Sequence, residues 1–148
     1  MIGPAGCGKS TFAAELAEEY RMAGEDVVIL SSDAIREELY GDASIQDNPA
    51  KVFNELHKRL REELKDGRSV IYDATNLVRA RRVEIVSYIM DNYPDYICTA
   101  YEFNTTLNEC IQRQTMRDRQ VPAQAIARQF RQYEVALRDE GWDCILRV

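Results

Sequence analysis

The sequence predicts an α/β protein in which helices cover both faces of a parallel sheet. Short apolar runs alternate along the chain with amphipathic stretches of helical spacing, which is the pattern of successive strand–helix units. A glycine-rich motif at the N-terminus leads directly into the first amphipathic stretch. The 148 residues suffice for one domain with its own core, and no Pro/Gly/Ser-rich linker divides them. We therefore expect a single domain over residues 1–148.

The first half of the chain is expected to contain helices and strands in alternation. Apolar periodicity predicts helices over 9–22, 33–40 and 49–66. A glycine follows each of these stretches, and glycine is favoured just past a helix end. The apolar runs at 27–30 and 69–72 are typical of strands that are buried on both faces.

The second half is expected to continue this alternation. Periodicity predicts a helix over 79–92 and a strand over 96–103. A capping box at Thr106–Glu109 predicts the start of another helix. A last helix is expected over 121–140, followed by a strand over 144–148. Because parallel sheets bind ligands at the carboxyl ends of their strands, the residues just after each strand are the candidates for a functional site.

The N-terminal motif fits G-x-x-x-x-G-K-[ST], the Walker A phosphate loop. Gly3 and Gly8 are expected to adopt positive φ, which lets the backbone approach a phosphate group. The following helix would point the positive end of its dipole at the same place. Lys9 can reach the β- and γ-phosphates of a nucleotide, and the Ser10 hydroxyl can be a Mg²⁺ ligand. The expected nucleotide-binding residues of the loop are Gly3, Ala5, Gly6, Cys7, Gly8, Lys9, Ser10 and Thr11.

Composition narrows the class of protein further. The chain is 45% hydrophobic and 30% charged, with a formal net charge of −6. It has no apolar run long enough to span a bilayer and no signal peptide ahead of the motif. The four cysteines are scattered without a C-x-x-C pair, which argues against a disulfide framework or a zinc site. We expect a cytoplasmic protein without a broad basic surface for duplex nucleic acid, although a local basic cluster could hold a few phosphates.

The segment Ser31-Ser32-Asp33-Ala34-Ile35-Arg36 follows the strand expected at 27–30. A carboxylate at Asp33 can accept the proton of an attacking hydroxyl, a role worth roughly 10²–10⁴ in rate. Arg36 lies one helical turn further on, and its planar guanidinium suits a phosphate of the acceptor. The alternatives are that Asp33 caps the short helix and that Arg36 is a solvated charge. The sequence leaves these alternatives open.

The segment Asp73-Ala74-Thr75-Asn76 follows the strand expected at 69–72. Asp73 closes a buried strand, as does the aspartate that holds the water shell of the metal in phosphate-loop enzymes. We therefore expect Asp73 to contact Mg²⁺ through water. Thr75 and Asn76 can bind the acceptor or cap the next helix, and for Asn76 we favour capping.

A group of arginines, Arg113, Arg117 and Arg119, follows the last long strand. Arg113 and Arg117 are four positions apart and share a helical face. An arginine that closes on a transferring phosphoryl group can supply roughly 10³–10⁵ in rate. We expect the region of about 106–121 to be a mobile lid, with an exposed basic helix as the alternative.

A second basic group, Arg79, Arg81 and Arg82, stands at the start of a helix, where cations are electrostatically unfavourable. It could bind substrate phosphates, but we favour a solvated face. His57 is the single histidine, and we expect it to be structural.

In this order, the motifs resemble the 5′-hydroxyl polynucleotide kinase branch of phosphate-loop kinases, which includes phage and bacterial nucleic-acid repair kinases. The resemblance covers nearly the whole chain: a Walker A loop, S-S-D-x-x-R, D-A-T-N and an arginine-bearing lid. It implies a phosphate-loop NTPase fold with three α/β/α layers and a parallel sheet. It also implies that ATP and Mg²⁺ are the cofactors, with Lys9 and Ser10 on the ATP phosphates and the metal.

The resemblance further implies a role for each matching residue. Asp33 would be the general base on the 5′-hydroxyl, and Arg36 would hold the neighbouring phosphate of the acceptor. Asp73 would support the site. Arg117, with Arg113 close by, would clamp the transferring phosphate. Repair kinases of this kind are often fused to phosphatase or ligase domains, so a fused or partner repair domain is an expected partner.

The chain departs from this family at both ends. Only Met1 and Ile2 precede the loop, where a strand of about five residues is expected, so we expect a truncated first strand. The chain stops at Val148, on its last strand. In related kinases the loop after that strand helps to hold adenine, so recognition of the base is open here.

The expected function is ATP-dependent transfer of the γ-phosphate to a hydroxyl, with the 5′-OH of DNA or RNA as the favoured acceptor. One alternative is a kinase of the same fold that acts on a small hydroxyl substrate such as a nucleoside, a sugar or an antibiotic. The negative charge and short length of the chain favour this alternative weakly. The other alternative is an ATP-binding or ATPase module that is not a kinase.

Overall fold

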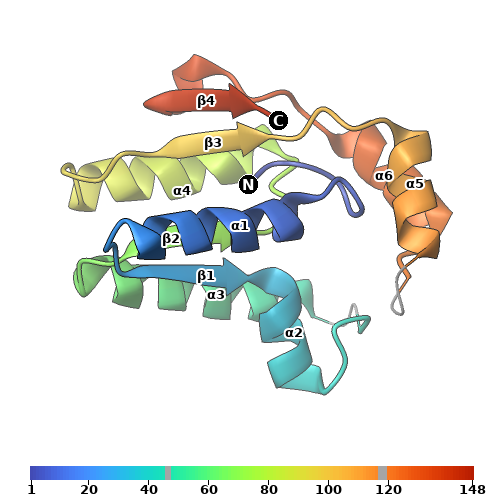
Figure 1. Cartoon of the computed structure of the whole chain (residues 1–148), viewed down its shortest axis with the longest axis horizontal. Helices are drawn as coiled ribbons and strands as arrows, with labels where there is room; N and C mark the ends of the chain where they lie inside the picture. The colour runs from blue at the N-terminus through green and yellow to red at the C-terminus, as the bar shows by residue number, and fades with distance from the viewer. Residues whose placement is uncertain (46–47, 117–119) are drawn as a thin grey trace. The chain divides into compact units, whose positions relative to one another are not determined.

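The computed structural model describes residues 1–45, 48–116 and 120–148 (Figure 1). The helices of these ranges are α1 (Lys9–Met22), α2 (Ser32–Tyr40), α3 (Pro49–Lys65), α4 (Arg79–Asn92), α5 (Leu107–Thr115), α6 (Ala123–Gln132) and the 3₁₀ helix η1 (Arg138–Glu140). The strands are β1 (Val27–Ser31), β2 (Ser69–Asp73), β3 (Thr99–Glu102) and β4 (Cys144–Arg147). Within the described ranges, no helix has both the length and the apolar character that a membrane crossing requires.

The chain forms two compact units. One contains Ser10–Ala74, and the other contains Met1–Lys9 together with Thr75–Val148. Each unit has a pair of strands, β1 with β2 in the first and β3 with β4 in the second, and both pairs are parallel. The predicted α/β class with parallel strands is therefore confirmed.

In the unit Ser10–Ala74, the longest helix packs on the strand pair through the stripe that the sequence predicts. β1 and β2 pair in register from Val27 opposite Ser69 to Ser31 opposite Asp73. α3 contacts both strands and α2, and Figure 1 shows it running along them. Its buried residues recur at every fourth position and are at most 4% exposed: Val52, Leu56, Leu60 and Leu64. Burying this apolar stripe is the main reason that α3 is stable.

In the other unit, the segment before the glycine loop pairs with β3. Ile2 forms a parallel bridge with Glu102, in which the Ile2 N–H donates to the Tyr101 carbonyl at 2.8 Å. The Phe103 N–H in turn donates to the Ile2 carbonyl at 3.0 Å. The Ile2 side chain is 1% exposed and packs in a core with Ala100 and Ala136. The sequence predicts a shortened first strand before the glycine loop, and the structure has a single β-bridge there, at Ile2.

The last predicted helix is too long. α6 ends at Gln132, and the chain continues in extended form before η1. Tertiary hydrogen bonds hold this extended stretch: the Tyr133 hydroxyl and the Ala136 N–H both donate to Glu102 Oε1, at 2.6 and 2.8 Å. The Glu134 N–H donates to the Leu77 carbonyl at 2.9 Å. These hydrogen bonds hold residues 133–136 in an extended conformation, so the helix that the apolar spacing predicts does not continue through them. β3 is also shorter than the strand predicted over 96–103.

The solvated basic face favoured for the start of α4 is wrong at Arg82, which is 1% exposed. Its Nε and Nη2 atoms each lie 2.7 Å from an oxygen of the buried Glu140 carboxylate. Its Nη1 also donates to the carbonyls of Asn76 and Leu77, at 3.0 and 3.1 Å. Burial acts to raise the pKa of Glu140, but hydrogen bonds from Arg82, Trp142 and the Leu137 N–H outweigh it and lower that pKa. The cation is tolerated near the helix start because a carboxylate neutralises it.

Candidate functional site

The glycine loop contains positive φ angles, although not at every glycine for which the motif suggested one. Gly6 and Gly8 adopt φ of 83° and 102°, a region that glycine enters without steric cost. Gly3 is not among the positive-φ residues, so that expectation is wrong. A Cβ on Gly3 would lie 2.7 Å from Cys7 Sγ and 3.1 Å from Phe103 Cβ. Gly3 is therefore needed for close packing rather than for its φ.

The loop runs straight into α1, which begins at Lys9. The first N–H groups of a helix have no partner within the helix and carry the positive end of its dipole, so they attract an anion. Lys9 is partly buried and its Nζ lies 3.4 Å from the Pro4 carbonyl, a long contact that a phosphate group could replace. Ser10 and Thr11 are exposed at the start of the helix. This arrangement can bind a polyphosphate.

Side chains of α5 and its preceding loop support the middle of the glycine loop. Arg113 Nη1 donates to the Cys7 carbonyl at 2.9 Å, and the Thr105 hydroxyl donates to the same oxygen at 3.2 Å. Arg113, which we expected to contact nucleotide phosphates, thus holds the loop itself. Arg117 and Arg119 lie outside the described residues, so their expected roles stay predictions. Thr105 was missed because it stands alone between β3 and the capping box.

Asp33 and Arg36 form an ion pair on α2. Arg36 Nη1 lies 2.5 Å from Asp33 Oδ1, with the Asp33 side chain 59% exposed and the Arg36 side chain 9% exposed. The helix is capped by Ser31, whose hydroxyl oxygen accepts the Ala34 N–H at 3.4 Å. The two alternatives, a capping Asp33 and a solvated Arg36, are therefore wrong. An accessible carboxylate oriented by a buried guanidinium can accept a proton.

Asp73 closes β2 and is 5% exposed. Its Oδ1 atom is buried, and the described parts of the chain give it no hydrogen-bond partner. A buried carboxylate oxygen without a donor is costly unless water or a cation reaches it. The oxygen therefore fits a water-carrying Mg²⁺. Among the described residues, no three or more His, Cys, Asp or Glu side chains gather around one point.

Thr75 and Asn76 form hydrogen bonds with the first residues of the chain. The Thr75 carbonyl accepts the Gly3 N–H at 3.0 Å. Asn76 has a φ of 49°, and its Nδ2 donates to the Met1 carbonyl at 2.7 Å. α4 begins after Val78, and its first N–H, from Arg79, donates to Glu134 Oε2. The expectation that Asn76 caps this helix is therefore wrong, because Glu134 does so.

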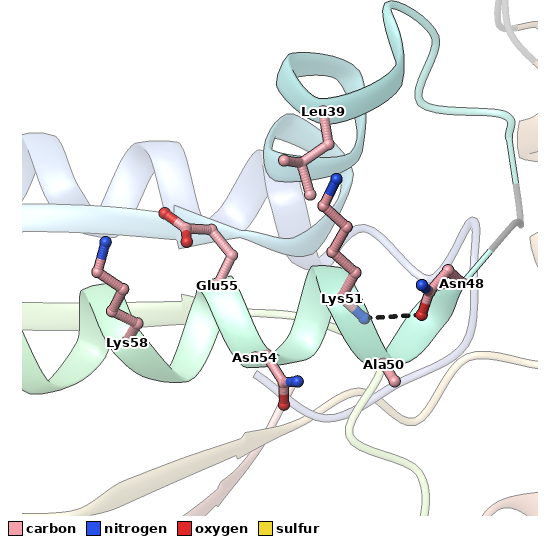
Figure 2. A pocket seen from close by; sticks show the side chains of 7 residues that line it. All are labelled: Leu39, Asn48, Ala50, Lys51, Asn54, Glu55 and Lys58. Atoms are coloured by element: carbon pink, nitrogen blue, oxygen red, sulfur yellow. Dashed lines mark hydrogen bonds between the residues drawn. The ribbon is translucent and has the colours of Figure 1, made fainter.

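A pocket of about 350 Å³ lies in the unit Ser10–Ala74 (Figure 2). Its lining comes from the end of α2 and the exposed face of α3: Leu39, Asn48, Ala50, Lys51, Asn54, Glu55 and Lys58. The Asn48 side chain caps α3 by accepting a hydrogen bond from the Lys51 N–H at 3.2 Å (Figure 2). Glu55 Oε1 accepts a hydrogen bond from Arg59 Nε at 2.9 Å. None of the site residues predicted from the sequence lines this pocket.

These features define a class of protein. Parallel strands, a glycine loop with positive φ at Gly6 and Gly8, a lysine at the start of the next helix and a buried aspartate at a strand end are those of a phosphate-loop nucleotide-binding protein. The chain belongs to the AAA_33 family, described as an AAA domain, whose family model matches residues 1–136.

Two relatives by sequence are named as kinases. A protein of Pyrococcus abyssi named "Probable adenylyl-sulfate kinase" is 37% identical over 89 residues, which are 60% of this chain and 44% of that protein. An L-seryl-tRNA(Sec) kinase of Methanococcus maripaludis is 25% identical over 144 residues, 97% of this chain and 54% of that protein. The chain thus spans about half the length of these relatives.

The fold has a counterpart among solved structures. A gluconokinase from Sinorhizobium meliloti 1021 superposes with a TM-score of 0.58 at 16% identity, over 99% of this chain and 78% of that one. This similarity shows a phosphate-loop kinase-like fold. The named sequence relatives and the matching structure are kinases, and none of them belongs by name to the polynucleotide kinase branch that the motifs resemble.

Proposed function

We propose that this chain is the core of an ATP-dependent kinase that transfers the γ-phosphate to a hydroxyl group of a small-molecule acceptor. The observation that carries the proposal is the loop: positive φ at Gly6 and Gly8 leads directly into a helix that begins with Lys9 and Ser10. This geometry suits the β- and γ-phosphates of a nucleotide. The kinase names of the relatives support phosphate transfer as the chemistry.

The proposed mechanism gives each residue one task. Lys9 and the N–H groups at the start of α1 bind the β- and γ-phosphates. The Ser10 hydroxyl, and Asp73 through water, would hold Mg²⁺, which would supply neutralisation of the phosphate charge. The acceptor hydroxyl oxygen forms a bond to the γ-phosphorus, the bond from that phosphorus to the β–γ bridging oxygen breaks, and ADP leaves. Asp33 takes the hydroxyl proton, and Arg36 holds the carboxylate in position through their ion pair.

Support for a small acceptor comes from two sources. The relative with the higher identity is named for adenylyl-sulfate, and the net charge of −6 disfavours a long polyanionic partner. The 5′-hydroxyl of an oligonucleotide is the second candidate. The S-S-D-x-x-R and D-A-T-N motifs favour it, and one relative is named for an acceptor carried on tRNA.

The test is transfer of label from γ-labelled ATP to a panel of acceptors in the presence of Mg²⁺. The panel contains adenylyl-sulfate, gluconate, nucleosides and a 5′-hydroxyl oligonucleotide beside its 5′-phosphorylated control. Asp33→Asn keeps an oxygen that can accept from Arg36 but removes the base, so transfer should fall by roughly 10²–10⁴. Glu37→Gln, an exposed carboxylate on the same helix, is the matched control and should keep wild-type transfer.

Each outcome decides between the candidates. Label on a small acceptor, lost in Asp33→Asn, supports the proposal. Label on the 5′-hydroxyl strand alone replaces the small acceptor by the second candidate. ATP hydrolysis that ignores every hydroxyl and survives Asp33→Asn refutes the kinase proposal and favours an ATPase module.

A further inference from the structure

We infer that Gln129 on α6 is a positioning residue, which fixes the glycine loop in the shape that receives nucleotide phosphates. The inference deepens the proposed function and rests on it. Gln129 was not singled out by any sequence motif, because it is an ordinary polar residue on an amphipathic helix. Its partner lies at the opposite end of the chain.

The contact is a short hydrogen bond to the loop backbone. The Ala5 N–H donates to Gln129 Oε1 at 2.7 Å, and 124 positions separate the two residues. Gln129 is half-buried on α6. Ala5 directly precedes Gly6, the first loop residue with positive φ. The bond therefore sets the direction of the peptide plane just before the loop reverses its course.

Gln129 completes a set of supports on successive loop residues. A Cβ on Gly6 would lie only 2.5 Å from the Cys110 carbonyl oxygen of α5, so the two backbones are in direct contact there. The Cys7 carbonyl accepts from Arg113 of the same helix at 2.9 Å. α5 thus holds Gly6 and Cys7, and α6, which packs against α5, holds Ala5. A loop held at three consecutive residues is preorganised, so less conformational entropy is lost when a ligand binds.

The side chain of Gln129 is a neutral amide, and its lack of charge suits a position beside a loop that binds anions. It supplies an acceptor for the Ala5 N–H without a negative charge beside a loop that binds phosphates. A glutamate at this position would keep an acceptor oxygen and add a charge that repels the ligand. The amide thus reconciles loop positioning with anion binding.

The test measures binding of ADP with Mg²⁺ to the full chain by titration calorimetry. Gln129→Met keeps the length of the side chain but removes the acceptor. It should weaken ADP binding about tenfold, the change that one hydrogen bond of ordinary net strength produces. The melting temperature of the unliganded protein should fall only modestly, because one part-buried hydrogen bond is lost. Gln124→Met changes an exposed glutamine of the same helix and should bind ADP as the wild type does.

Gln129→Glu is the second variant, which guards against loss of folding in the first. It keeps the acceptor, so it should melt as the wild type does while binding ADP at least tenfold more weakly. Wild-type affinity in Gln129→Met overturns the inference and leaves the proposed function standing. A wild-type protein that binds no ADP refutes the proposed function and the inference together.

Discussion

Removing the Arg82 side chain should destabilise the protein more than any other single arginine substitution on α4. Arg82 and Glu140 have side chains that are 1% and 0% exposed, and the guanidinium meets the carboxylate through two contacts of 2.7 Å. Arg82→Met leaves a buried carboxylate without its cation, which costs about 3–5 kcal/mol in comparable buried pairs. Glu140 would keep its hydrogen bonds from the Leu137 N–H and Trp142 Nε1. Because these hydrogen bonds remain, the loss of stability should lie at the lower end of that energy range.

The loss should depend on pH. The pKa of Glu140 in the folded chain lies below its ordinary value of 4.5. The stability that this carboxylate contributes is therefore present above pH 4.5 and is lost as the pH falls through the folded pKa. Arg82→Met removes a partner that lowers this pKa, so Glu140 protonates more readily in the variant. The difference in the free energy of unfolding should accordingly shrink between pH 7 and pH 4.

The assay is urea unfolding followed by circular dichroism at both pH values. The matched control is Arg79→Met on the same helix, where the ion pair with Asp139 is 42% and 66% exposed. Exposed pairs contribute roughly 0.2–1 kcal/mol, so the control should unfold nearly as the wild type does. The reasoning is refuted if Arg82→Met costs no more than Arg79→Met at pH 7.

The remaining predictions concern the loop, the candidate base and the cysteines. Gly6→Ala forces a side chain into a φ of 83° and against the Cys110 carbonyl, at a cost of about 1–3 kcal/mol; unchanged ADP affinity and unfolding would contradict the assigned geometry. Arg36→Ala releases Asp33 and should lower transfer to the acceptor while ADP affinity stays the same; equal losses in both would remove its separate role. Burial raises the pKa of the Cys110 thiol to about 11, and Cys7 and Cys98 are buried as well. At pH 8 a thiol reagent should therefore modify the exposed Cys144 first, and rapid uptake that persists in Cys144→Ser would show that this burial is wrong.

Local signals were sufficient to predict most of the elements. α1 and α4 begin and end where the periodicity places them, and the four-residue spacing of α3 identifies its buried face. The capping box that opens α5 is present with both of its hydrogen bonds. These features depend on residues within one or two turns of each other, so the sequence carries the information directly.

The predictions that failed have a common cause, which is a partner residue far away in the sequence. Arg82 is buried because it meets Glu140, 58 positions away, and α6 ends early because residues after it bond to Glu102. The motif identifies the glycines of the loop, but the structure shows that Gly3 is needed for packing while Gly6 takes the positive φ. Gln129 lies 124 positions from its partner. Such long-range partners become visible only in three dimensions.

The most direct test of the central claim is the transfer of γ-labelled phosphate from ATP by the full chain and by its Lys9→Ala variant. Lys9 stands where the loop enters α1, and removing its charge from the β- and γ-phosphates should abolish transfer while the fold is kept. We expect label on a hydroxyl acceptor with the wild type and none with the variant. Equal transfer by both proteins, or a wild type that neither binds nor uses ATP, would contradict the claim that this loop serves a kinase.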